Sequence, residues 1–110
     1  MILQLFVGRS HLRGKKEALA PKLQAHLAYM VALEREGVLF ASGPFIEGGE
    51  PVGEGLSIVR ASSAASAQAV LDRDPFVLAG LRAYEVSEWR VLEGSFQVSV
   101  SLSDQTGALR

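Results

Sequence analysis

The sequence has no cysteine, few aromatic residues and no excess of charge of either sign. Without cysteine it can form neither a disulfide nor a thiolate metal site. Its 11 basic and 12 acidic residues leave a net charge of −1, whereas a nucleic-acid-binding surface needs a basic face. No apolar run approaches the roughly 18 residues of a membrane span, and residues 1–7 lack the basic start of a signal peptide. We therefore expect a cytoplasmic protein with neither a nucleic-acid nor a membrane partner.

What the sequence does have is a large share of apolar residues for its length. Hydrophobic residues make up 48% of its 110 residues. A small domain buries proportionally less of its surface than a large one, so this surplus indicates burial against a second copy of the chain. The length allows one domain, which we expect over residues 1–103, followed by a disordered tail at 104–110.

Apolar spacing and breaker residues predict four strands and two helices before residue 93. Leu23, Leu27, Met30 and Leu33 recur at helical spacing and are expected to face the core. Glycine, proline and charge predict loops at 9–16 and 46–55, and residues 76–81 are expected to form one further turn. The strands are expected at 2–7, 38–42, 56–61 and 82–92, one helix from Pro21 to Gly37, and the other from Ser62 or Ser63 to Asp74.

This order of elements, βαββαβ, is that of an α+β ferredoxin-like fold. Two helices cover only one face of such a sheet, and the first two strands are apolar on both faces. We therefore expect a homodimer that packs two sheets face to face into a barrel-like sandwich and could associate further. A monomer with a ligand-filled face is the alternative.

Two features near the C-terminus bear on this packing. In the strand at 82–92, Tyr84 and Val86 share one face whereas Trp89 and Val91 share the other, so the strand either contains a bulge or passes between packing layers. Apolar residues then alternate with polar ones from residue 96 to 103. This pattern predicts an extra C-terminal strand at the sheet edge or against the partner.

His26 is the first candidate for chemistry. It precedes Met30 by four residues and Leu33 by seven, so it lies on or beside the buried stripe of its helix. Histidine exchanges a proton near neutral pH. The alternative is a partly buried histidine whose ring is bonded to a backbone carbonyl.

Asp74 is the second candidate. Aspartate followed by proline is a common start of a helical turn, so Asp74 could simply cap the turn that begins at Pro75. One carboxylate oxygen can accept a backbone N–H while the other orients an imidazole, so both roles can coexist. His26 and Asp74 can meet where the two helices lie side by side, and such a pair would fix one tautomer and make the histidine more basic.

Two ordered segments carry a resemblance to a known family. The first contains Ala25-His26-Leu27, Leu33, Gly37 and Ser42-Gly43-Pro44; the second, within 67–80, contains Asp74-Pro75-Phe76 and Ala79-Gly80. Together they resemble the YciI-like family over residues 1–92. The resemblance implies a dimeric α/β-barrel fold with a histidine–aspartate pair in a cleft near the subunit interface. It also implies kinship with a dehydrochlorinase that acts on a chlorinated hydroxyquinol.

The sequence departs from this family before the histidine. Family members often have an arginine there, whereas this chain has Lys22, Leu23 and Gln24. A substrate anion would therefore be met by Lys22, or by Arg9 or Arg13 in the preceding loop. The strand after residue 92 also lies outside the family pattern.

Two further residues are expected to contact a small-molecule ligand. Ser42 could place a hydroxyl in the cleft, although a serine at a strand end more often bonds a turn. Phe76 could form an apolar wall, although aromatic residues are more often part of the core. The glutamates show no metal-ligand spacing with histidine, and the glycine-rich segment is not a phosphate loop. We expect neither a metal nor a cofactor.

Two functions remain open from the sequence. One is a cofactor-independent enzyme in which His26, oriented by Asp74, moves a proton on a small cyclic substrate, as in elimination, isomerisation or hydrolysis. The other is a non-catalytic binding or accessory module in which the same cleft only holds a ligand.

Overall fold

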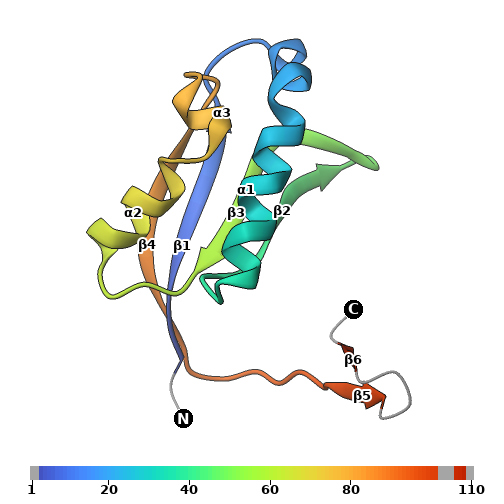
Figure 1. The fold of residues 1–110 in the computed structure, drawn as a ribbon, viewed down its shortest axis with the longest axis vertical. Helices are drawn as coiled ribbons and strands as arrows, with labels where there is room; N and C mark the ends of the chain where they lie inside the picture. The colour runs from blue at the N-terminus through green and yellow to red at the C-terminus, as the bar shows by residue number, and fades with distance from the viewer. Residues whose placement is uncertain (1–2, 102–105, 109–110) are drawn as a thin grey trace.

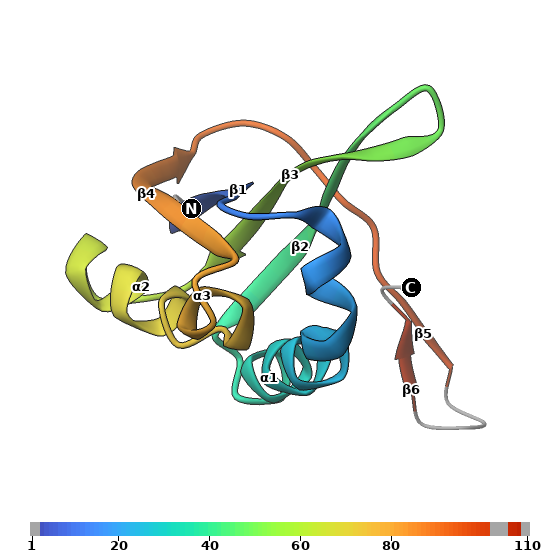
Figure 2. The ribbon, with the colours of Figure 1, turned by 90° about the horizontal axis from the view of Figure 1, so that it is seen from above.

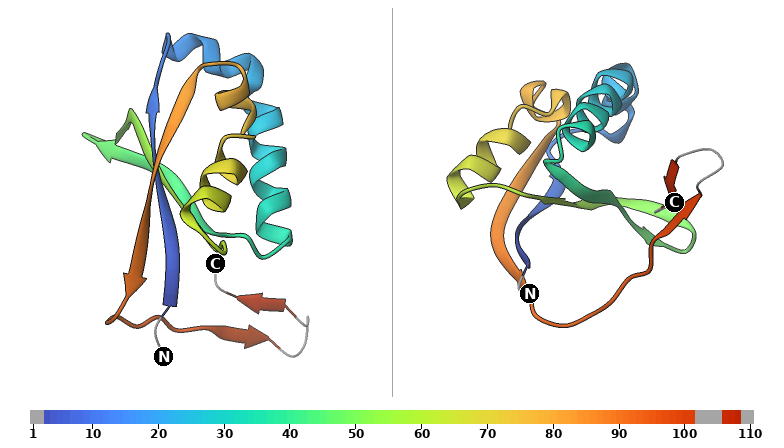
Figure 3. Two further views of the ribbon diagram at one scale, coloured as in Figure 1. Left: turned by 90° about the vertical axis from the view of Figure 1, so that its left-hand side faces the viewer. Right: turned by 60° about the horizontal axis from the view of Figure 1, so that its bottom comes forward.

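The structure, a computed structural model, describes residues 3–101 and 106–108. Four antiparallel strands form a sheet in the order β2-β3-β1-β4, and the helices lie on one of its faces (Figures 1 and 3). The expected ferredoxin-like α+β fold is confirmed. Its elements are β1 Leu3–Leu12, the 3-10 helix η1 Lys16–Lys22, α1 Leu23–Arg35, β2 Leu39–Glu47, β3 Glu50–Val59, α2 Ala64–Leu71, α3 Pro75–Leu78 and β4 Arg82–Val91.

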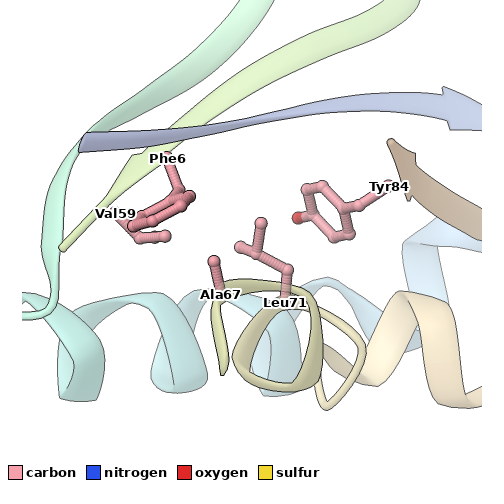
Figure 4. Close-up of a cluster of buried hydrophobic side chains, with 5 residues drawn as sticks. All are labelled: Phe6, Val59, Ala67, Leu71 and Tyr84. Carbon is pink, nitrogen blue, oxygen red and sulfur yellow. The ribbon is translucent and has the colours of Figure 1, made fainter. Parts of the chain in front are cut away.

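The core lies between this sheet and α2, where side chains from both meet (Figure 4). Gly8 of β1 allows the close approach of α2, because a Cβ atom there would lie 2.4 Å from Cδ1 of Leu71. Alternation along β1 places Gly8 and its neighbours two residues away on this covered face. The buried cluster consists of Phe6, Val59, Ala67, Leu71 and Tyr84.

The first helical region differs from its expected form at its N-terminal end and in the stripe that it buries. β1 continues to Leu12, and the 3-10 helix η1 forms where a loop and the start of the long helix were expected. The buried face of α1 is also rotated relative to the expected one. Met30 and Leu33 are buried as expected. Leu23 and Leu27, which were expected to face the core, are instead 45% and 47% exposed. His26 lies in line with Met30 and Leu33 and is partly buried.

The expected loop at 46–55 is instead the end of a β-hairpin. β2 and β3 extend to a turn at Gly48 and Gly49, whose φ angles are +61° and +82°. Two successive positive φ angles match the twist of the strands, and glycine adopts them without strain. The tip of the hairpin extends beyond the helices (Figure 2).

The second helical region follows its expected boundaries closely. The Ser63 side chain caps α2 by accepting a hydrogen bond from the Ser66 N–H. Asp74 has an extended ψ of 129°, as expected before proline, and its side chain caps the short helix α3. Gly37, with φ of +76°, follows the end of α1 as expected.

β4 pairs with β1 without a register shift, so the change of face along β4 is not a bulge. Trp89 pairs with Leu5 on the face opposite the helices, whereas Tyr84 pairs with Ser10 on the covered face. We call the face opposite the helices the open face. No helix among the described residues is long and apolar enough to cross a membrane.

The C-terminal segment leaves the main sheet after β4 (Figures 1 and 3). Of the strand expected at 96–103, residues 99–101 form β5 Ser99–Ser101, which pairs with β6 Thr106–Ala108, whereas 96–98 are not in a strand and 102 and 103 lie outside the described residues. Phe96 and Val98 precede β5 and are exposed. The expected disordered tail at 104–110 contains β6, and residues 104, 105, 109 and 110 lie outside the described part of the chain.

Candidate functional site

A histidine and an aspartate meet where α1 passes the start of α3. Nδ1 of His26 lies 2.9 Å from Oδ1 and 3.0 Å from Oδ2 of Asp74. The His26 side chain is 20% exposed and that of Asp74 is fully buried. The Tyr29 hydroxyl, three residues after His26, donates a hydrogen bond to the carbonyl oxygen of Val70 and so ties α1 to α2. The structure therefore brings together the two residues that the sequence singled out.

Asp74 is held by three different donors. Besides His26, the backbone N–H of Phe76 donates to Oδ1 at 2.9 Å and the Tyr84 hydroxyl donates to Oδ2 at 2.7 Å. Burial by itself raises the pKa of Asp74, but the hydrogen bonds from His26, Phe76 and Tyr84 outweigh it and lower the pKa below its ordinary value. The carboxyl group is therefore ionised at neutral pH. Both expected roles, helix cap and histidine partner, coexist in this one side chain.

The charge of Asp74 determines which tautomer of His26 forms. An ionised carboxylate has no proton to donate, so Nδ1 of His26 carries the proton of their hydrogen bond. Nε2 then bears a lone pair. In the described part of the chain Nε2 has no hydrogen-bond partner, and no side-chain nitrogen or oxygen without a partner is buried. Solvent or a ligand can therefore reach Nε2.

Tyr84 extends the pair into a chain of three side chains. Its hydroxyl is buried, and burial together with the negative charge of Asp74 raises the pKa of Tyr84 well above its ordinary value. The hydroxyl stays protonated and donates to Asp74. From the sequence, Tyr84 was expected only as a strand residue on the same face as Val86. A buried tyrosine hydroxyl needs a hydrogen-bond partner, and this rule could have identified Tyr84 as part of the site.

Phe76 supports the histidine ring from one side. The two rings stack with centroids 4.3 Å apart and an interplanar angle of 16°. The His26 ring is therefore fixed by the Nδ1 hydrogen bond and by this aromatic contact. Pro75 begins α3 directly after Asp74, so the turn that positions the carboxylate also positions Phe76.

A hollow of about 140 Å³ opens beside His26 and Phe76. It is bordered by residues of β1, β3 and β4 and by the Gly43-Pro44 step of β2. A second hollow of about 430 Å³ shares His26, Pro44, Phe76 and Arg82 with it and is otherwise mostly apolar. A cavity of roughly 150 Å³ accepts benzene in another protein, so the first hollow has the size of a single ring.

The other residues proposed from the sequence divide into two groups. Ser42 lines the first hollow. Lys22 is exposed and lines neither hollow. Arg9 instead forms an ion pair of 2.9 Å with Glu54, and Arg13 is exposed.

The cation that the structure does bring to the hollow is Arg82, the first residue of β4. Nothing in the sequence singled it out, because its place beside the hollow depends on the pairing of β4 with β1, in which Arg82 lies opposite Leu12. Within the described residues no group of three or more histidine, aspartate or glutamate side chains could hold a metal ion. What the site offers is one accessible imidazole nitrogen, an oriented carboxylate and one arginine.

Comparison with known proteins found one solved enzyme structure with a similar fold over most of its length. The chain is similar to 5-chloro-2-hydroxyhydroquinone dehydrochlorinase (TftG) from Burkholderia phenoliruptrix AC1100, whose structure is a complex with 2,5-dihydroxybenzoquinone. The two share 25% identity with a TM-score of 0.63, and the match covers 79% of this chain and 93% of the other. Comparison with curated protein sequences gave no match.

Two other solved structures are similar at a lower level. SnoaB, a cofactor-independent oxygenase from Streptomyces nogalater, has 14% identity and a TM-score of 0.47, covering 83% of this chain and 94% of its own. An antibiotic biosynthesis monooxygenase has 12% identity and a TM-score of 0.47, and the match covers 84% of this chain and 100% of the other.

The family model described as YCII-related domain matches residues 6–90. This range runs from Phe6 in β1 to Arg90 in β4 and so includes nearly all of the sheet-and-helix unit, and the chain belongs to the YCII-related family.

Proposed function

We propose that this chain is a cofactor-independent enzyme that moves a proton on a small cyclic substrate, with His26 as the general acid–base group. One observation carries the proposal: Nδ1 of His26 is bonded to the buried carboxylate of Asp74, while Nε2 is accessible beside a hollow of about 140 Å³. A base whose far nitrogen is held by a carboxylate keeps its lone pair directed at the substrate.

The proposed step uses only the groups that face the hollow. Nε2 of His26 takes a proton from a ring carbon or a hydroxyl of the substrate, and the resulting imidazolium is stabilised by the ionised Asp74. The proton is then returned elsewhere on the substrate in an isomerisation, or a leaving group departs in an elimination. Asp74 is a positioning residue here, because His26 and Tyr84 separate its oxygens from the hollow.

The likeness to the dehydrochlorinase supports a ring-shaped substrate. That enzyme was solved with 2,5-dihydroxybenzoquinone, a single six-membered ring with oxygen substituents. The first hollow of this chain has a volume suited to one such ring, with Phe76 as an apolar wall and Ser42 as a hydroxyl contact. We propose Ser42 and Phe76 as substrate-binding residues. Lys22, also expected to bind the substrate, would have to reach the hollow from outside.

The test is a screen for turnover with chlorinated hydroquinones, small phenols and lactones, followed by two substitutions. We expect His26→Ala and Asp74→Asn each to lower kcat by roughly a hundred- to ten-thousand-fold, the usual contribution of general acid–base catalysis. The other histidine, His11, lies outside both hollows, so His11→Ala is the matched control and should leave kcat unchanged. Circular dichroism of each variant checks that the fold is retained.

Activity that survives both His26→Ala and Asp74→Asn would rule out the proposed mechanism. The alternative function, a non-catalytic binding or accessory module, is favoured by the structural duties of Asp74, which caps α3 and binds Tyr84 whatever His26 does. A compound that binds and shifts the His26 ring signals in NMR spectra, with no turnover in the whole screen, would identify such a module.

We also propose that the protein is a homodimer formed through the open face of the sheet. Trp89 is 44% exposed there, and Leu5, Phe40, Trp89 and Phe96 border an apolar hollow of about 400 Å³. Filling it with side chains of a second copy would bury this surface. Ser57 of β3 lines the first hollow and the next residue, Ile58, lies on the open face, so the cleft and the proposed interface would be separated only by the thickness of the sheet. The cytoplasmic location expected from the sequence stays a prediction.

A further inference from the structure

Arg82 lies in the site but has no role in the proposed mechanism, and it is not part of the two segments that resemble the family. It is the first residue of β4 and pairs with Leu12, which puts its side chain on the covered face with Tyr84. It lines both hollows that His26 lines. The guanidinium carbon lies 6.0 Å from the centroid of the Phe76 ring, and the His26 ring stacks on that same ring. Phe76 therefore holds a cation and an imidazole at one hollow.

The hydrogen bonds of Arg82 fix one side of its guanidinium group and leave the other side unused. Nη1 donates to the carbonyl oxygen of Gly53 at 3.0 Å and to Oγ of Ser10 at 3.4 Å. In the part of the chain that the structure describes, Nε and Nη2 have no partner, and neither is a buried atom without a partner. These two nitrogens form the planar edge with which arginine binds a carboxylate or a similar anion in a bidentate way.

The acidic residues near Arg82 are already bound to other groups. Glu54 also lines the first hollow, but its carboxylate forms the 2.9 Å ion pair with Arg9. Asp74 accepts its hydrogen bonds from His26, Phe76 and Tyr84. No salt bridge joins Arg82 to any carboxylate among the described residues. The positive charge at the hollow is thus left without a protein counter-ion.

We infer that Arg82 binds the anionic group, a carboxylate or a phenolate, of a single-ring substrate and so places the ring beside His26. This inference rests on the proposed function and names its substrate class. The roughly 140 Å³ hollow limits the bound part to about one ring. An anion held there also favours the positive charge that His26 acquires when it takes a proton. Arg82 thus fills the role that sequence analysis gave to Lys22, Arg9 or Arg13.

The experiment measures binding rather than turnover, so that it can fail independently of the proposed mechanism. Benzoate and salicylate are titrated into the full-length protein by isothermal calorimetry, with benzamide and salicylamide as uncharged partners of the same shape. We expect the anions to bind at least ten-fold more tightly than the amides, as a charge-assisted bidentate contact contributes about ten- to a hundred-fold. Arg82→Met should remove this preference, and Arg82→Lys, which keeps the charge but loses the planar edge, should retain only part of it.

Two controls separate the possible outcomes. Arg13→Met removes an exposed arginine that lines neither hollow and should leave benzoate affinity unchanged. His26→Ala should lower kcat as predicted above but keep the preference for anions; loss of the preference in that variant would assign the anion to His26 and overturn the inference. Equal binding of anions and amides by the wild type, or an unchanged preference in both Arg82 variants, would overturn it as well. Thermal unfolding of every variant confirms that losses do not come from misfolding.

Discussion

The two faces of the central sheet are built from alternate residues of the same strands, and they differ in almost every property. On the covered face, Phe6, Gly8 and Ser10 of β1 lead from the apolar core to the hollow beside His26. On the open face, the apolar residues Leu5 and Val7 of β1 are followed by Arg9, whose exposed ion pair with Glu54 is not joined to any buried polar network among the described side chains. The same backbone therefore supports a site on one side and an unpaired surface on the other.

The difference shows how the site is kept rigid. Asp74, Tyr84 and His26 form a buried network in which each polar atom has a partner or reaches the hollow. Such a network specifies one arrangement because any displacement leaves a buried group without a partner. Around Trp89 the open face is mostly apolar, and apolar contacts are non-directional, so this part could accept a second copy without a fixed pattern of hydrogen bonds. The positioned site and the proposed dimer interface thus lie on opposite faces.

The largest expected effect is on the open face. Trp89→Glu places a charge on the proposed dimer interface, and we expect the dimer Kd to rise at least about a thousand-fold, which corresponds to roughly 4 kcal/mol. Light scattering after size exclusion measures the change from dimer to monomer. Leu78→Glu is the control, because Leu78 is 72% exposed on α3, on the covered side. A wild-type protein that is monomeric at high concentration would contradict the proposed interface.

The next largest effect is in the core of the covered face. Leu71→Ala should lower the free energy of unfolding by about 3 kcal/mol, since Leu71 is fully buried between α2 and Gly8 and its removal leaves a cavity. Urea unfolding measures the change. Leu78→Ala removes the same atoms from an exposed position and should cost under about 0.5 kcal/mol. Equal losses for both leucines would show that α2 does not pack as described.

Much of this arrangement could be predicted from the sequence, because the deciding signals are local. The proline after Asp74 allowed the end of the second helix to be predicted, and Gly37 allowed the end of α1 to be predicted. The spacing of His26, Met30 and Leu33 placed the histidine toward the sheet. The hairpin at Gly48 and Gly49 was missed although two adjacent glycines are a recognised turn signal. The prolines and glutamates around them made a long loop the simpler interpretation.

The rest depends on contacts between distant strands. Arg82 enters the hollow only because β4 pairs with β1 in one particular register, in which Arg82 is opposite Leu12. A shift of one residue would turn it toward the open face. For the same reason Tyr84 could be recognised as buried but not as a partner of Asp74. Lys22 was favoured because it is near His26 in the sequence, whereas Arg82 lies near it in space.

A smaller effect on stability is expected from the charge of Asp74. Asp74→Asn should destabilise the fold by about 2 kcal/mol at neutral pH, because hydrogen bonds to an ionised acceptor are lost. The folded pKa of Asp74 is lowered from its ordinary value of 3.8, so its contribution is present above pH of about 4 and is lost as the pH falls through the lowered pKa. The two stability curves should therefore converge in acid.

Urea unfolding between pH 2 and 7 measures this convergence. Glu85→Gln removes one negative charge from an exposed residue with no hydrogen bond in the described part of the chain, and serves as the control for net charge. A difference between wild type and Asp74→Asn that stayed constant down to pH 2 would mean that the ionised carboxylate contributes nothing of its own.

The smallest effect, and the most selective one, is expected at Tyr84. Tyr84→Phe removes the 2.7 Å hydrogen bond to Oδ2 of Asp74 but keeps the ring in the core, so the loss of stability should be about 1 kcal/mol. With one donor fewer, the pKa of Asp74 should rise, and the acid loss of stability should begin at a higher pH than in the wild type. Tyr29→Phe is a matched control, because it also removes a hydroxyl with one hydrogen bond, to the carbonyl of Val70. Tyr29→Phe should lower the free energy of unfolding by a similar amount without shifting the pH at which stability is lost in acid. If both variants shift the acid loss of stability equally, the shift does not come from the Tyr84–Asp74 hydrogen bond, and the network around Asp74 reduces to the His26 pair and the α3 cap.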